Sequence, residues 1–283
     1  MADTDLAVDR LGRADLDAAH GLSDAAGWTT RRSDWRRMIE LDAVDAFAGR
    51  LDGRLVTTAT LVRYGSRVGW IGMMLVHPEH RRRGHGTRML RACLDAADDA
   101  GVATVGLDAN AEGEPLYDAH GFVPVADVTR WRGSVAGPDR PDRIASVADP
   151  DPFAALDRRA SGVDRRFLLS SLLEDDGTVG LLRRGPDGAV VGYALALRRP
   201  PGVTVGPLVA EDPQTAEALL RAAGQRTDGG PIAVNAVGNP RATARYRALG
   251  LDHRRSLTRM TYREPVRPLV DERIWGFPAF AYG

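Results

Sequence analysis

The chain has 283 residues, which is enough for two domains that each bury a core of their own. Its 38 lysine-plus-arginine positions, all of them arginine, balance 38 acidic residues. A net charge of zero argues against a protein that holds nucleic acid on a basic face. The single cysteine, Cys93, excludes an internal disulfide and a cysteine-rich metal site, and its helical spacing predicts that it packs in a core.

The chain carries no signal for a membrane or for export. No apolar run approaches the 18 or so residues that a membrane span needs. The first ten residues, MADTDLAVDR, lack the basic start and apolar block of a signal peptide. We therefore expect a cytoplasmic protein with no membrane partner.

The first quarter of the chain predicts a short strand, two helices and a hairpin. Ser33 or Asp34 is the expected N-cap of the second helix, and Asp52-Gly53 is a favoured hairpin turn. The predicted bounds in chain order are Asp5–Val8, Ala14–Ala25, Ser33–Leu41, Ala43–Leu51 and Leu55–Tyr64.

The most informative stretch joins an apolar strand to a helix through a glycine loop. Val68–Val76 reads as a buried strand that stops before Pro78, and Gly84 and Gly86 follow. Apolar residues then recur at helical spacing over Thr87–Ala100, and Gly101 is the expected C-cap.

This loop has the features of a phosphate cradle. Glycines let the backbone approach a ligand, and the first NH groups of a helix attract an anion. Arg81, Arg82 and Arg83 add positive charge at the same place. No Gly-Lys-Ser/Thr follows, which excludes a Walker loop, and Arg88-Met89 after Thr87 does not fit the dinucleotide pattern GxGxxG.

Downstream, the pattern completes one domain and begins another. It predicts a strand at Val102–Ala109, a short helix between Pro115 and Gly121, and a strand at Phe122–Trp131. Turn formers and charged pairs over GSVAGPDRP (133–141) predict a linker. The expected organisation is a first domain at 1–133, a linker at 134–141 and a second domain at 142–283.

The second part of the chain repeats the first at an offset of 129 residues. Asn110, Tyr117, Gly121 and Phe122 correspond to Asn239, Tyr246, Gly250 and Leu251, which suggests a duplicated fold. Further elements of the second copy are expected as a turn at Pro186-Asp187-Gly188, strands at Val203–Val209 and Ile232–Val237, and a helix at Gln214–Ala223.

The repeat fails at the glycine loop. The second copy has Ala210-Glu211-Asp212-Pro213-Gln214-Thr215 there, with two carboxylates and no glycine. Each carboxylate would repel a pyrophosphate by about 1 kcal/mol at the surface, and more if buried. We therefore expect no phosphate-bearing ligand in the second copy, with Asp212 serving as a helix N-cap before Pro213.

Three segments together resemble the GNAT acyltransferase superfamily. They are Val76-His77-Pro78, the pattern Arg81-x-x-Gly84-x-Gly86, and Leu116 to Phe122 in the following helix. The resemblance implies an α/β fold with a mixed sheet (α+β), in two tandem acyl-CoA N-acyltransferase-like domains. It implies acetyl-CoA as co-substrate of the first domain and a primary amine, expected on a small molecule, as acceptor. The second domain is then a degenerate copy that completes or shields the acceptor cleft.

The resemblance also assigns the site. Backbone groups of the fourth strand would pair with the pantetheine arm, one NH would face the thioester oxygen, and loop NH groups would hold the pyrophosphate. Tyr117 matches the position that often protonates the leaving thiolate, and the alternative interpretation is a packed helix aromatic. The expected cofactor residues are Met74, Leu75, Val76, Arg81, Arg82, Arg83, Gly84, His85, Gly86, Thr87 and Asn110.

Several residues keep two interpretations. Asn110 either bonds the CoA arm or caps a helix, and Asp108 is either a general base or a turn or cap ligand. Trp28 either contacts the acceptor or fills the gap between two helices. The aromatic segment Arg273–Gly283 either returns across the domain boundary or packs in the local core.

The histidines predict no metal. His85 is expected to face solvent or phosphate. His77, His80 and His120 lack a cysteine or histidine partner at metal spacing.

The sequence thus favours an acetyl-CoA-dependent N-acetyltransferase. An alternative is a sensor or scaffold that binds acetyl-CoA without catalysis. Nucleic-acid binding through Arg81–Arg83 is disfavoured by the balanced charge and the lack of interleaved aromatics. A homodimer is compatible with the sequence.

Overall fold

The computed structural model describes residues 6–136, 143–227, 230–264 and 269–283. The first half contains β1 (Ala7–Arg10), α1 (Leu16–Ala25), α2 (Arg32–Glu40), β2 (Val44–Leu51), β3 (Arg54–Tyr64), β4 (Val68–Val76), α3 (His85–Asp99), β5 (Thr104–Ala109), α4 (Glu114–Asp118) and β6 (Val123–Gly133). The second half contains β7 (Ile144–Val147), α5 (Asp151–Ser161), α6 (Arg166–Leu173), β8 (Val179–Arg184), β9 (Val190–Arg199), β10 (Gly202–Ala210), α7 (Pro213–Gly224), β11 (Ile232–Val237), α8 (Pro240–Ala248), β12 (Asp252–Arg263) and β13 (Ile274–Gly276). Within these ranges, every helix is too short or too polar to cross a membrane.

The predicted elements are present, and the differences lie at their ends. The N-cap of α2 is Arg31, so the prediction of Ser33 or Asp34 is wrong. Asp34 acts from three residues inside, where its carboxylate accepts the Arg31 backbone NH at 3.0 Å. A single-turn helix at 13–15 precedes α1, and α3 begins at His85, two residues before the predicted start. Most of the predicted linker lies outside the described residues.

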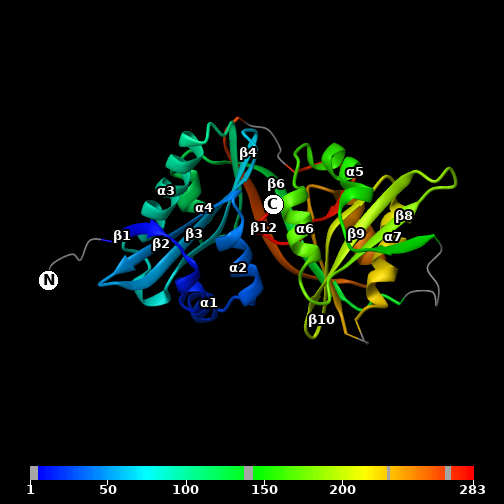
Figure 1. Ribbon diagram of the computed structural model, residues 1–283, viewed down its shortest axis with the longest axis horizontal. Helices are drawn as coiled ribbons and strands as arrows, with labels where there is room; N and C mark the ends of the chain where they lie inside the picture. The colour runs from blue at the N-terminus through cyan, green and yellow to red at the C-terminus, as the bar shows by residue number, and fades with distance from the viewer. Residues whose placement is uncertain (1–5, 137–142, 228–229, 265–268) are drawn as a thin grey trace.

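One mixed sheet of 13 strands runs through both halves, which exchange strands β6 and β12 at the centre of the sheet (Figure 1). The order is β1-β2-β3-β4-β5-β12-β6-β11-β10-β9-β8-β7, and the thirteenth strand, β13, pairs with β10 outside this row. Strand β12 from the second half pairs antiparallel with β5, and β6 from the first half pairs antiparallel with β11. The boundary near residue 133 stays a prediction from the sequence, and the sheet is continuous across it.

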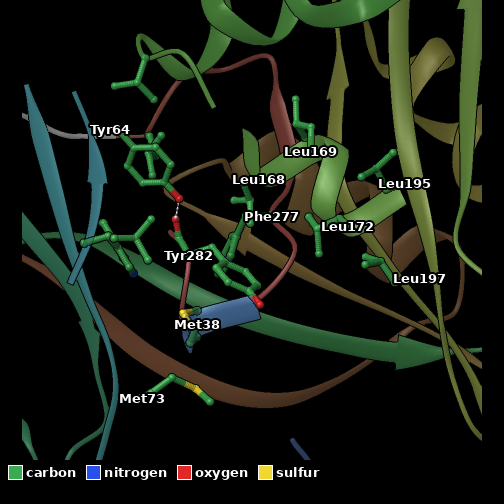
Figure 2. Packing of buried hydrophobic residues seen from close by; sticks show 14 of the residues in the cluster. Met38, Tyr64, Met73, Leu168, Leu169, Leu172, Leu195, Leu197, Phe277 and Tyr282 are labelled. Atoms are coloured by element: carbon green, nitrogen blue, oxygen red, sulfur yellow. Dashed lines mark hydrogen bonds between the residues drawn. The ribbon is translucent and has the colours of Figure 1, made fainter. Parts of the chain in front are cut away.

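The buried residues form a core on each side of this sheet. One cluster lies between the sheet and helices α3 and α4 of the first half. It contains Cys93, which is fully buried as predicted. A second cluster packs α7 and α8 against the second half. The third cluster spans both halves on the opposite side of the sheet, with Met38 of α2 and Leu168 of α6 among its members (Figure 2).

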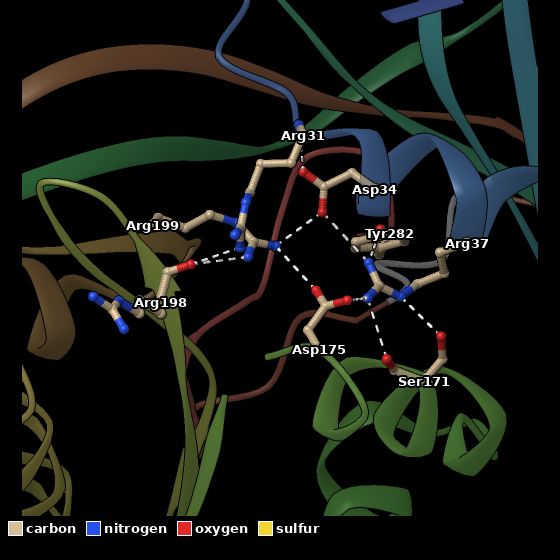
Figure 3. A network of polar contacts seen from close by, with 8 residues as sticks. All are labelled: Arg31, Asp34, Arg37, Ser171, Asp175, Arg198, Arg199 and Tyr282. Carbon is tan, nitrogen blue, oxygen red and sulfur yellow. Dashed lines mark hydrogen bonds and ion pairs between the residues drawn. The ribbon is translucent and has the colours of Figure 1, made fainter. Parts of the chain in front are cut away.

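A polar network clamps the two halves together at the rim of this shared core (Figure 3). The Arg37 guanidinium, only 2% exposed, donates to the Ser171 hydroxyl at 3.0 Å and pairs with Asp175 at 2.7 Å. Arg199 of β9 pairs with Asp34 of α2 at 2.8 Å. These contacts hold the start of α2 against the second half.

The last residues cross from the second half to the first, as one of the two alternatives predicted. The Trp70 indole NH of β4 donates to the Phe280 carbonyl at 2.9 Å, and the Tyr64 hydroxyl donates to the Tyr282 carbonyl at 2.5 Å (Figure 2). The backbone of Ala281 lies against Gly72, where an added Cβ would meet it at 2.7 Å. Gly72 therefore permits this close passage over β4.

Candidate active site

Strands β4 and β5 pair in parallel at their beginnings and then separate. The parallel pairing covers Val68 to Trp70 and ends there. Among the described residues, the rest of β4 pairs with β3 alone. This leaves one edge of Met74, Leu75 and Val76 available to an extended ligand.

A bulge distorts β4 at the mouth of this opening. The ladder with β3 shifts register between Thr58 and Thr60, and Met73 has a φ of 47°. A positive φ is strained for a side chain of this size, and such strain is often found at functional sites. The Thr58 hydroxyl donates to the Met73 carbonyl at 2.9 Å, so the distortion is held from the β3 side.

The loop after β4 forms a concave backbone at the start of α3. Arg82 has a φ of 61° and Gly84, the N-cap of α3, has a φ of 79°. Successive NH groups in such turns converge on an anion, and the helix dipole adds to the attraction. Gly84 suits this position because its conformation is left-handed. The exposed Arg81 and Arg83 side chains fold back onto loop carbonyls, those of Val76 and Glu79.

The first three residues of α3 are partly or fully buried. His85 is 8% exposed, which excludes the solvent-facing alternative, while contact with phosphate stays a prediction. It is the first residue of α3, and this position turns its side chain into the protein. Gly86 is half-buried, and an added Cβ would approach the Leu116 side chain at 3.3 Å. Thr87 is also half-buried in the first turn.

Asn110 and Tyr117 lie at the end of β5 and on α4. The Asn110 side-chain oxygen accepts the Gly113 NH at 2.8 Å, so it holds the turn that leads into α4. Tyr117 is 8% exposed, and its ring packs edge-on against Phe122 at 5.9 Å between centroids. Burial raises the pKa of the Tyr117 hydroxyl above its usual range. Its hydroxyl has no hydrogen-bond partner among the described residues.

The second half shows what the corresponding residues do when the opening is filled. Its strands β10 and β11 also pair in parallel and then separate after Val205 and Val234. The chain's own segment Glu272–Phe277 fills the gap, and β13 within it pairs antiparallel with β10. The Phe277 NH donates to the Asn235 carbonyl of β11 at 3.0 Å.

Asn239 and Tyr246, the counterparts of Asn110 and Tyr117, bind this inserted segment. The Asn239 amide donates to the carbonyls of Glu272 and Ile274, both at 3.0 Å. The Tyr246 hydroxyl donates to the Trp275 carbonyl. A peptide thus lies in the slot of the second half, with the repeated Asn and Tyr donating to its carbonyls.

The carboxylates that interrupt the repeat have ordinary partners. Asp212 caps α7 by accepting the Thr215 NH at 2.7 Å, and Pro213 opens the helix, as predicted. Glu211 pairs with Arg159 at 3.3 Å in an exposed position. The second half therefore differs from the first in two ways. Its loop lacks the glycines, and its slot holds the inserted segment.

Asp108, the candidate base, lies in a buried ion pair. Both of its oxygens accept from Arg259 of β12, at 2.8 and 2.9 Å, and both side chains are 0% exposed. Burial raises the pKa of Asp108, while Arg259 opposes the shift. A raised pKa would suit a base, but the bidentate contact occupies both oxygens. This geometry favours a structural role across the strand exchange.

The remaining candidates stay as expectations. Trp28 is half-buried and packs against the shared core, which fits either of its interpretations. His77, Glu79 and His80 bring one possible metal-ligand atom each to within 4.8 Å, a proximity that the sequence spacing did not suggest. The three residues are at most partly buried, and we assign no metal to them.

Comparison with known proteins decides the family. A model described as the acetyltransferase (GNAT) family matches residues 16–122, and a model described as the acetyltransferase (GNAT) domain matches residues 153–276. The chain is a tandem GNAT protein. One GNAT domain lies on either side of the predicted linker, as the repeat indicates.

Its relatives are distant in sequence. The chain is 28% identical over 192 residues to the uncharacterised N-acetyltransferase YitH of Bacillus subtilis, a match that covers 65% of this chain and 66% of YitH. It is 27% identical over 199 residues to the holothin acyltransferase of a Pseudoalteromonas species, a match that covers 69% of this chain and 66% of that protein. A solved structure from Pyrococcus horikoshii, assigned to the acetyltransferases, is 24% identical with a TM-score of 0.86. The match covers 100% of this chain and 98% of the Pyrococcus chain. At this identity it shows that the two proteins share a fold.

Proposed function

We propose that the tandem GNAT protein transfers an acetyl group from acetyl-CoA to an amine, with the cofactor bound in the first half. Membership of a family of acetyltransferases supports acyl transfer in general. The filled slot of the second half supports the finer statement. Pantetheine carries amides as a peptide does, so Asn110 and Tyr117 can donate to it as their counterparts donate to the inserted segment.

In this proposal each part of the first half has one task. The loop at Arg81–Thr87 holds the pyrophosphate through backbone NH groups. The open edge of β4 pairs with the pantetheine arm and fixes the thioester beside the bulge at Met73, which supplies positioning. Tyr117 gives its proton to the departing thiolate. The amine attacks from the other side of the sheet, where the shared core and the last residues lie.

Release of free thiol from acetyl-CoA across an amine panel tests this function. We expect thiol release that depends on both acetyl-CoA and an amine and yields one acetylated amine per thiol. The sensor alternative predicts tight binding of acetyl-CoA, measured by calorimetry, with no amine-dependent release. Amines related to holothin belong in the panel because a relative is a holothin acyltransferase.

A further inference from the structure

Two arginines stand directly opposite each other on the exchanged strands. Arg130 of β6 and Arg255 of β12 are cross-strand partners, and their strands pair antiparallel. They share a face of the sheet with Val128 and Leu257, which belong to the core between the halves. Like charges directly opposite one another destabilise a sheet unless something compensates them.

No carboxylate compensates this pair within the described chain. The buried arginines Arg37, Arg165 and Arg259 have the acidic partners Asp175, Asp157 and Asp108. Arg130 is half-buried and Arg255 is exposed. Arg130 instead donates to the neutral side-chain oxygen of Asn235 at 3.2 Å. Burial lowers the pKa of Arg130, and the charges of Arg255 and Arg132 lower it further.

Both guanidinium groups are held in place with donors to spare. Arg255 lies over the ring of Phe280 at 5.3 Å, a cation–π contact that fixes its plane. Arg130 is fixed by Asn235. Each guanidinium has five NH donors, so together they can bind the oxygens of a carboxylate or phosphate.

The pair lies beside the proposed acceptor side of the site. Phe280, which contacts Arg255, also accepts the Trp70 indole NH of β4. Arg255 stands four residues along β12 from Arg259, the partner of Asp108 on β5. Four residues of strand span about 13 Å, a length that a small acceptor molecule can bridge.

We propose that Arg130 and Arg255 bind an anionic group of the acceptor, so that the substrate is an amine that also carries a carboxylate or a phosphate. This rests on the proposed function for the identity of the amine. The anion site itself stands on the geometry of the arginine pair.

Anion binding is tested first, without catalysis. Thermal unfolding is followed in the presence of inorganic phosphate or succinate, with sodium chloride replacing them to keep the ionic strength constant. We expect a concentration-dependent rise in Tm for the wild type and loss of that rise in Arg130→Gln and Arg255→Gln. Arg54→Gln is the matched control, because Arg54 is exposed at the start of β3, several strands away from β6 and β12. An equal rise in all four proteins overturns the site.

The acceptor class is tested next with ω-amino acids, ω-aminoalkyl phosphates and alkylamines of the same lengths. We expect kcat/KM to be at least tenfold higher for one anionic series than for the neutral amines. Arg130→Gln and Arg255→Gln should each raise KM for that series about ten- to a hundredfold, with kcat nearly unchanged. Equal kcat/KM for anionic and neutral amines overturns the proposed acceptor class.

These outcomes separate the two proposals. If phosphate or succinate stabilises the wild type while acetyl-CoA does not bind, the proposed function fails and the anion site remains. If acetyl-CoA is consumed but the arginine variants behave as the wild type does, the proposed function remains and this inference fails.

Discussion

Replacing Tyr117 with phenylalanine is expected to lower kcat for acetyl transfer about a hundredfold, or about 2.7 kcal/mol in the barrier, and to leave KM for acetyl-CoA nearly unchanged. The change keeps the ring that packs on Phe122 and removes only the proton that the thiolate would take. Steady-state thiol release measures both constants. A kcat equal to that of the wild type would contradict the assignment of the acid.

The chain provides a matched control in the second half. Tyr246→Phe removes the equivalent hydroxyl, which donates to the Trp275 carbonyl of the inserted segment. We expect it to lower the free energy of unfolding by about 1 kcal/mol and to leave kcat within twofold of the wild type. A loss of kcat in this variant would mean that the second half takes part in catalysis.

The same assignment fixes the sign of a pH effect. A general acid acts while it is protonated, and burial raises the pKa of Tyr117 above its ordinary value of 10. Deprotonation therefore moves to higher pH, and kcat should show no loss from this group up to about pH 10.

Removal of the Asp108 carboxylate is expected to reduce the free energy of unfolding by about 3–5 kcal/mol. Asp108→Ala would leave the Arg259 guanidinium buried without its counter-ion, which is the costly way to break such a pair. Urea unfolding measures the loss. Asp98→Ala removes the exposed partner of Arg263, also on β12, and should cost less than about 1 kcal/mol.

The milder change Asp108→Asn distinguishes a structural ion pair from the predicted role of Asp108 as general base. If the ion pair is structural, folded Asp108→Asn should retain kcat within a few fold, because the reacting amine does not contact this residue. A drop of a hundredfold or more in kcat without loss of stability would restore Asp108 as the general base.

Local patterns predicted the elements that position the site. Gly84 and Gly86 between an apolar strand and an amphipathic helix identified the loop, because the residues that form it are neighbours in the sequence. The repeat of Asn110 and Tyr117 at Asn239 and Tyr246 identified the duplication for the same reason. The misplaced α2 cap shows the limit: the sequence could not tell whether Asp34 caps from the N-cap or from within the first turn.

Long-range pairing was beyond the sequence. An alternating strand reads the same whichever sheet edge it joins, so β6 and β12 gave no signal of their exchange. The partner of Asp108 stands 151 residues away, and Arg130 meets Arg255 only because of that exchange. The aromatic character of the last residues was a signal, but it did not specify that Glu272–Phe277 fills the slot of the second half.

Calorimetric titration with acetyl-CoA, followed by a crystal structure of the complex, tests the central claim most directly. We predict one acetyl-CoA per chain, with its pyrophosphate on the backbone of Arg82–Thr87 and its pantetheine arm along β4 beside Asn110. The stoichiometry should not change in Asp212→Ala, because the inserted segment still fills the second slot. Two molecules per chain, or a single molecule beside α7 in place of that segment, would contradict the account.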